Sequence, residues 1–159
     1  MDAMLERLHY AQGELISEGA SDYAQALSPH PTRARVTADQ FAEYDANIAA
    51  HSRQLRMTEE HGRTWKPHQY LALLFTEHYL QRYFDDPEAL CADLNHEKAS
   101  HRPTASMPDY TVEDLHTLAF QSATGSGKTL LMHAHILQYR HYLDRAGKRL
   151  NNIVLVTPN

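Results

Sequence analysis

A short glycine-rich stretch, residues 122–129, reads Ser122-Ala123-Thr124-Gly125-Ser126-Gly127-Lys128-Thr129. It has the pattern of a phosphate-binding P-loop, in which backbone N–H groups and the positive end of the following helix face the phosphates of a nucleotide. Gly125 and Gly127 let the backbone curl with positive φ and approach a ligand closely. Lys128 supplies a mobile positive charge for the β- and γ-phosphates, and the hydroxyl of Thr129 is an oxygen ligand suited to Mg²⁺. The stretch therefore predicts a site for a nucleotide and Mg²⁺.

Both flanks of this stretch favour a strand–loop–helix unit. Leu118-Ala119-Phe120 is an apolar run suited to a buried parallel strand, and residues 128–146 have apolar side chains at helical spacing, with Gly147 as a stop signal. Residues 153–157 form a second, β-branched run, so we expect a right-handed parallel βαβ unit and an α/β fold. Ser122 stands where the strict motif has glycine. The alternative to a P-loop is a plain turn between two core elements.

Four more helices are expected before the loop. Residues 2–19 have an amphipathic pattern, and Thr37 with Gln40 has the form of a capping box that opens a helix to about residue 60. These two helices would make a helical N-terminal arm, residues 1–62. Pro67 suits the start of a further helix that ends near residue 84, and Pro87 the start of a short one to about residue 98, before an exposed loop at 99–109.

Composition excludes several classes of protein. A chain of 159 residues with 42% hydrophobic residues and a net charge of -5 is ordinary for one globular domain and gives no general basic surface for nucleic acid. No apolar run is long enough to span a bilayer and no secretion signal is present, so we expect a cytoplasmic protein without a membrane partner. Cys91 is the sole cysteine, which excludes an internal disulfide, and the twelve histidines lack metal-site spacing.

Three segments together resemble the beginning of the first RecA-like domain of a superfamily 2 helicase, of the DEAD/DEAH-box family that includes the restriction (Res) subunits of type III restriction enzymes. Residues 123–129 resemble motif I of that family. Val156-Thr157-Pro158-Asn159 resembles motif Ia, in which a Thr-Pro pair contacts the backbone of the tracked strand. Trp65-Lys66-Pro67-His68-Gln69 resembles the upstream segment whose glutamine reads adenine.

The resemblance implies a specific role for each of these segments. Residues 63–159 would be the N-terminal part of a RecA-like ATP-binding domain, with an insertion at about 85–114. ATP and Mg²⁺ would bind at Thr124–Thr129, Gln69 would read adenine, and Thr157 with Pro158 would face DNA. A methyltransferase (Mod-like) subunit would be a further partner. Gln69 is equally well explained as a glutamine that simply stands at the start of a helix.

The chain lacks the acidic D-E-x-x motif and the arginine that ATP hydrolysis requires, so no catalytic residue is predicted within it. We therefore expect an ATP-binding N-terminal fragment of an ATP-dependent DNA helicase or translocase that does not itself turn over ATP. One alternative is a small P-loop kinase or GTPase-like protein, for which Asp144 is the sole acidic residue after the loop. Another is a non-enzymatic fragment whose helical arm docks to a partner.

Overall fold

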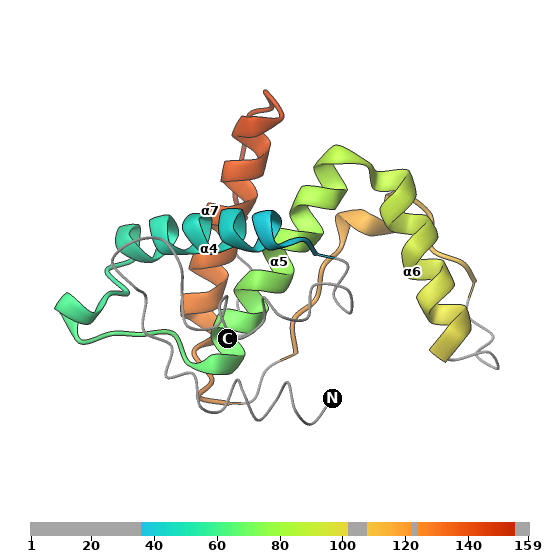
Figure 1. Cartoon of the computed structure of the whole chain (residues 1–159). Coiled ribbons are helices and arrows are strands. Elements are labelled where there is room, and N and C mark those ends of the chain that lie inside the picture. Colours follow the sequence, from blue (N-terminus) through green and yellow to red (C-terminus); the bar gives the residue numbers. More distant parts are fainter. Residues whose placement is uncertain (1–35, 102–107, 122–123, 155–159) are drawn as a thin grey trace.

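The computed structural model describes residues 36–101, 108–121 and 124–154 (Figure 1). Helices dominate these residues, and single 3-10 turns lie in the connection between α4 and α5 and in the longer one between α6 and α7. In chain order the elements are α4 (Ala38–Gln54), η1 (Glu59–His61), α5 (Pro67–Asp85), α6 (Pro87–His101), η2 (Glu113–His116) and α7 (Lys128–Arg145).

The centre of the fold is formed by α4, α5 and α7, with α4 lying across the other two (Figure 1). Contacts along α5 and α7 show that the two helices run in the same direction. Near their starts, the side chain of Gln69 reaches the backbone of Ser126, and near their ends Arg145 pairs with Asp85. Consequently, the first turns of α5 and α7 meet at one end of the fold.

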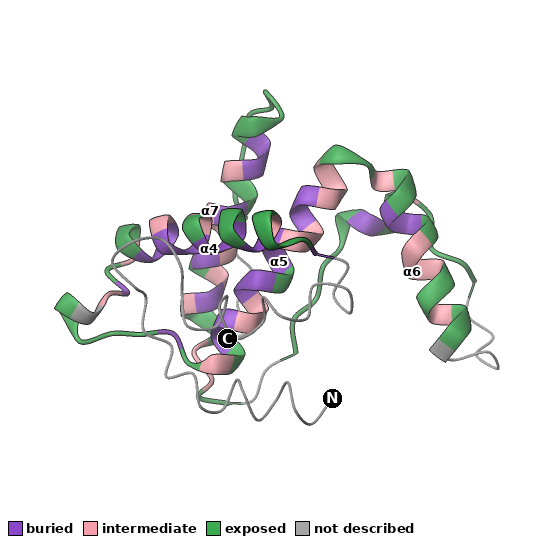
Figure 2. Ribbon diagram, in the orientation of Figure 1, coloured by how far each residue is buried: buried purple, intermediate pink, exposed green. Residues whose placement is uncertain are grey.

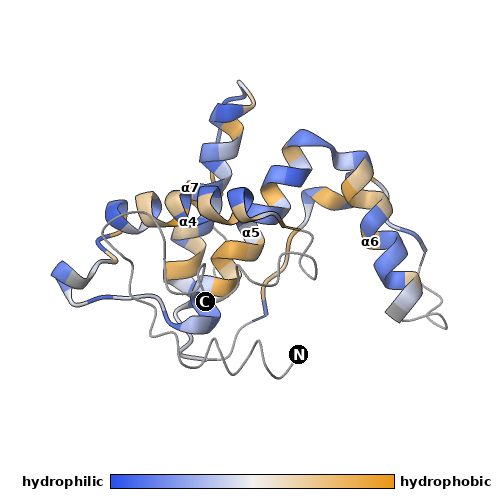
Figure 3. Cartoon of the chain, in the orientation of Figure 1, coloured by the Kyte–Doolittle hydropathy of each residue, from blue (hydrophilic) through white to orange (hydrophobic). Residues whose placement is uncertain are grey.

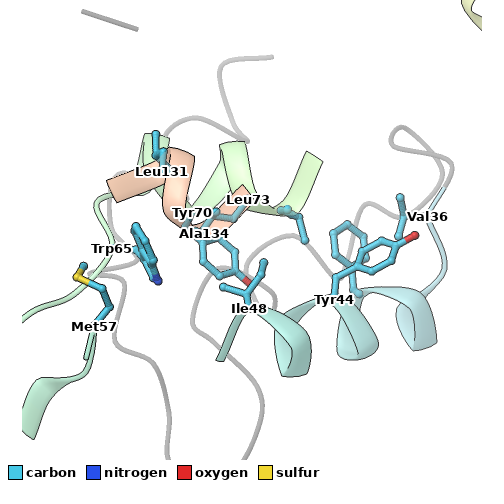
Figure 4. Packing of buried hydrophobic residues seen from close by; sticks show 11 residues of the cluster. Val36, Tyr44, Ile48, Met57, Trp65, Tyr70, Leu73, Leu131 and Ala134 are labelled. Carbon is cyan, nitrogen blue, oxygen red and sulfur yellow. The ribbon is translucent and has the colours of Figure 1, made fainter. Parts of the chain in front are cut away.

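The main hydrophobic core fills the space between these three helices, and hydrophobic segments converge there (Figures 2 and 3). Trp65 and Met57, from the connection between α4 and α5, close one end of the core (Figure 4). The buried members of this core are Val36, Phe41, Tyr44, Ile48, Met57, Trp65, Tyr70, Leu73, Leu74, Leu131 and Ala134. Since residues 36–62 supply five of them, the described part of the predicted arm packs into the same core as the helix after the glycine-rich stretch.

A buried carboxylate ties the same three helices together. Glu77 on α5 has no exposed surface and accepts hydrogen bonds from Asn47 of α4 at 3.0 Å and from Gln138 and Tyr142 of α7 at 2.8 and 2.9 Å. Burial raises the pKa of this carboxyl, and the three donors act in the opposite direction. Polar side chains therefore fix how α7 sits against α5 and α4, because a misplaced partner would leave buried groups unsatisfied.

Local sequence signals set most helix boundaries as predicted, and the end of α4 is the exception. Thr37 and Gln40 form the expected reciprocal capping box at the start of α4. Pro67 and Pro87 open α5 and α6, and Gly147 follows α7 with a φ of 67°. Helix α4 ends at Gln54, earlier than residue 60, because the chain turns at Arg56, whose φ is 54°.

The predicted α/β fold is wrong: the described residues are helical and contain no strand. Leu118-Ala119-Phe120 forms neither a strand nor a helix, and Leu118 and Phe120 are each 44% exposed. Ile153 and Val154, at the start of the second apolar run, are 54% and 82% exposed. The expected parallel βαβ unit, and with it the RecA-like start, is therefore absent from this part of the chain, since an apolar run becomes a strand only where a partner strand accepts its hydrogen bonds.

Within the region predicted to be an insertion, 85–114, the described residues include α6, which packs at the end of α5. Leu90 and Cys91 of α6 pack with Leu115 of η2 in a second buried cluster beside the end of α5. Cys91 is a buried free thiol. None of the helices in the described ranges is both long and apolar enough to span a membrane. The predicted helix at 2–19 and most of the loop at 99–109 lie outside the described residues.

Candidate nucleotide-binding site

The glycine-rich stretch leads directly into α7. Gly125 has a φ of 75° and Gly127, the N-cap residue of the helix, has a φ of 84°. Both values lie in the left-handed region that favours glycine, so the expected positive φ at these two residues is confirmed. Lys128 and Thr129 occupy the first turn of the helix and are exposed to solvent. The charged amine and the hydroxyl therefore stand at the positive end of an 18-residue helix.

The side chain of Gln69, on the first turn of α5, contacts the glycine-rich stretch. Its Nε2 donates to the backbone carbonyl of Ser126 at 2.9 Å, and its Oε1 accepts from the backbone N–H of Lys66 at 2.9 Å. The side chain is buried, and a Cβ at Gly127 would lie 2.5 Å from Nε2. Glycine is therefore required at 127 both by its φ and by the close approach of Gln69.

A pocket of about 540 Å³ opens beside the stretch, a size typical of small-molecule sites, which span roughly 300–1,000 Å³. One wall is the backbone of residues 124–126. The facing walls are mostly apolar and come from α5, from α7 and from the segment before the stretch, and the lining residues are His68, Ala72, Phe120, Gln121, Thr124, Gly125, Ser126 and Leu131. His68 Nε2 also lies 3.5 Å from the carbonyl oxygen of Ser126.

Phe120 stands on the boundary between this pocket and a second, smaller one. The second pocket has a volume of about 220 Å³ and is lined by residues of α5, η2, α7 and the segment before the glycine-rich stretch, more than half of them with aromatic rings. The ring of Phe120 stacks on that of His135 with a centroid distance of 4.1 Å and an interplanar angle of 27°. Burial lowers the pKa of His135 from 6.5 to about 4, so its ring is neutral at physiological pH.

The structure brings together seven of the predicted site residues. Thr124, Gly125, Ser126, Gly127, Lys128 and Thr129 form one continuous stretch, and Gln69 contacts it from α5. Thr157 and Pro158, predicted to face DNA, lie outside the described residues. The sequence did not single out Phe120 or His68 as site residues. For His68 a signal was present, because it directly precedes Gln69 and therefore lies at the same end of the helix.

The groups gathered at the site are of the kinds that attract anions. Backbone N–H groups, the ammonium of Lys128 and the N-terminal end of α7 all favour phosphate oxygens. No group of three or more His, Cys, Asp or Glu side chains that could hold a metal ion occurs within the described ranges. A magnesium ion here would have the hydroxyl of Thr129 as its protein ligand, and phosphate oxygens and water as the others, which is the arrangement that Mg²⁺ commonly adopts beside a nucleotide.

No protein-family model matches this sequence, and neither a curated protein nor a solved structure is significantly similar to it. The resemblance of residues 123–129 and 156–159 to helicase motifs thus stays a prediction.

Proposed function

We propose that this chain binds ATP with Mg²⁺ through residues 124–129. The observation that carries the proposal is the conformation of the loop: Gly125 and Gly127 both adopt positive φ directly before Lys128 and Thr129, which are exposed at the start of α7. This backbone lets successive N–H groups turn toward one anion, and the lysine and the helix end supply positive charge at the same point. The pocket beside the loop has room for the rest of a nucleotide.

The proposal concerns binding rather than turnover. Hydrolysis of ATP needs an acidic residue that positions Mg²⁺ and the attacking water, and a cation that stabilises the transferring phosphoryl group. No described residue is assigned to either role. A part in DNA translocation, with DNA and a methyltransferase subunit as partners, rests on the motif resemblance alone and stays a prediction.

Isothermal titration calorimetry of the purified chain with MgATP tests the proposal. Lys128→Ala removes a charge-assisted hydrogen bond worth roughly 1.5–3 kcal/mol, so the dissociation constant should rise about 10- to 100-fold. Arg140→Ala is the matched control, since it removes one positive charge from an exposed position further along the same helix and should leave the affinity within about twofold because surface charges are screened at this range.

Two outcomes would refute the proposal: wild-type chain that binds no MgATP at millimolar concentration, or Lys128→Ala and Arg140→Ala proteins with equal affinities. A parallel titration with MgGTP separates the alternatives retained from the sequence. A clear preference for the guanine nucleotide would favour a GTPase-like protein over the ATP-binding assignment.

A further inference from the structure

We propose that Phe120 is the platform on which the nucleobase of the bound nucleotide stacks, in the pocket beside residues 124–126. This inference rests on the proposed function, since it takes the phosphates to lie at the glycine-rich stretch and asks where the base then goes. The answer comes from four features of the described residues: the exposed face of Phe120, the apolar wall opposite the loop, the hydrogen bonds of Gln69 and the supporting ring of His135.

Phe120 has the environment of a stacking residue. Its ring is supported by the His135 ring at 4.1 Å, yet 44% of the residue remains exposed, and it lines the pocket. A ring that is fixed on one side and open on the other offers a flat surface at little entropic cost. Base–aromatic stacking is favourable for any base, because every base has a π-face.

The pocket that Phe120 lines is also lined by three residues of the glycine-rich stretch. Thr124, Gly125 and Ser126 line it on one side, so a nucleotide whose phosphates contact the loop has its base within the same cavity. Ala72 and Leu131 give the rest of the wall an apolar character, and His68 adds a second aromatic ring at the edge. A flat heterocycle is the ligand group that suits such a lining.

The carboxamide of Gln69 bonds to the protein backbone. Both polar atoms of its carboxamide have a partner: Nε2 donates to the Ser126 carbonyl, and Oε1 accepts from the Lys66 N–H. Because the side chain is buried and both of its polar atoms already bond to the loop and to the start of α5, it presents little surface to a base. Gln69 therefore acts as a positioning residue for the loop, and recognition of the base falls to the aromatic surface.

The test compares two probes, MgATP and magnesium tripolyphosphate, which share the phosphate chain and differ in the nucleoside. Phe120→Ala should weaken MgATP binding about tenfold or more, while changing tripolyphosphate binding by less than about twofold. Lys128→Ala should weaken the binding of both probes. Leu118→Ala is the matched control, because Leu118 is also 44% exposed in the same segment but lines only the smaller pocket, and it should leave both affinities unchanged.

Phe120→Trp provides a second readout that does not require loss of the ring. The chain has a single tryptophan, Trp65, which is buried, so the new indole would report on the pocket. Its emission should be quenched by MgATP and not by tripolyphosphate, and this variant decides the question if Phe120→Ala fails to fold by circular dichroism.

The possible failures are distinguishable. If wild-type chain binds neither probe, the proposed function fails and this inference falls with it. If wild-type chain binds both probes, but Phe120→Ala weakens them equally or not at all, only the stacking role is overturned. Indole emission of the Phe120→Trp protein that stays unquenched in saturating MgATP would overturn it as well.

Discussion

Replacing Gly127 with alanine should cost much more stability than replacing Gly125, although both residues have positive φ. Alanine in the left-handed region costs about 1–2 kcal/mol, and this cost applies at both positions. At Gly125 nothing lies within 4 Å of the new Cβ, whereas at Gly127 the Cβ would stand 2.5 Å from Gln69 Nε2. The Gln69 side chain must then move and lose its bonds to the Ser126 carbonyl and the Lys66 N–H, each worth about 0.5–1.5 kcal/mol.

The expected destabilisation is therefore about 1–2 kcal/mol for Gly125→Ala and about 2–5 kcal/mol for Gly127→Ala. Urea unfolding followed by circular dichroism measures both. Gly147→Ala is an additional control, because Gly147 has a φ of 67° and open space around it but lies at the far end of α7. It should behave like Gly125→Ala in stability and leave MgATP affinity unchanged.

A double-mutant cycle with Gln69→Ala isolates the contact. Once the glutamine is removed, Gly127→Ala should cost only the left-handed strain of about 1–2 kcal/mol, so the two substitutions should be non-additive by about 1–3 kcal/mol. Gly125→Ala should cost the same in both backgrounds. Additivity of Gln69→Ala with Gly127→Ala, or equal costs of the two glycine substitutions in the wild-type background, would show that Gln69 does not hold the loop in the way described.

Three further predictions concern the helical core. Thr37→Ala removes the N-cap of α4 and should lower the free energy of unfolding by about 1 kcal/mol in urea titrations. Burial and the neighbouring His141 lower the pKa of His51 from 6.5 to about 4. The contribution of this residue to stability is therefore present above pH 6.5 and is lost as the pH falls toward 4. His51→Leu should flatten that decline in urea midpoints measured across this pH range. Glu77→Leu removes the acceptor shared by Asn47, Gln138 and Tyr142, and the Tyr142 hydroxyl is then buried without this partner. The substitution should cost about 2–5 kcal/mol, more than Glu77→Gln, by the same titration.

The helix boundaries were predictable because the signals that set them are local. A capping box at Thr37, prolines at 67 and 87 and a glycine at 147 act on the backbone within one turn of themselves. Their effect does not depend on the rest of the fold, so they predict the helix starts and most of the ends closely, whereas the end of α4 lies at Gln54 and not near residue 60.

The strands were predicted wrongly because a strand is not a local structure. The apolar run at Leu118–Phe120 has the composition of a buried strand, but its backbone needs hydrogen-bonding partners from another segment. In the described residues α7 instead packs on α4 and α5, where Leu131 and Ala134 enter the core between them. The run consequently crosses the surface, and the ring of Phe120 meets His135 of α7.

The candidate site was likewise predictable in its local features and not in its long-range contacts. The positive φ of Gly125 and Gly127 follows from residue type and motif, whereas the role of Gln69 depends on how two helices are placed. Glu77 illustrates the same limit in the core: a glutamate on a helix normally faces water, and its complete burial depends on donors from α4 and α7. Such contacts join residues far apart in the chain, which no spacing pattern records.

The direction of the helices adds a reason for placing the proposed anion site at this end of the core. Because α5 and α7 run the same way, the first turns of both lie at one end of the core, joined by the hydrogen bond from Gln69 to Ser126. The positive ends of two helix dipoles therefore meet beside the glycine-rich stretch, and their attraction for phosphate adds to that of Lys128. The Glu77 contacts fix α7 on α5 further along and so maintain this alignment. In this fold the buried polar contacts and the loop are parts of one arrangement, since a shift of α7 along α5 would break both.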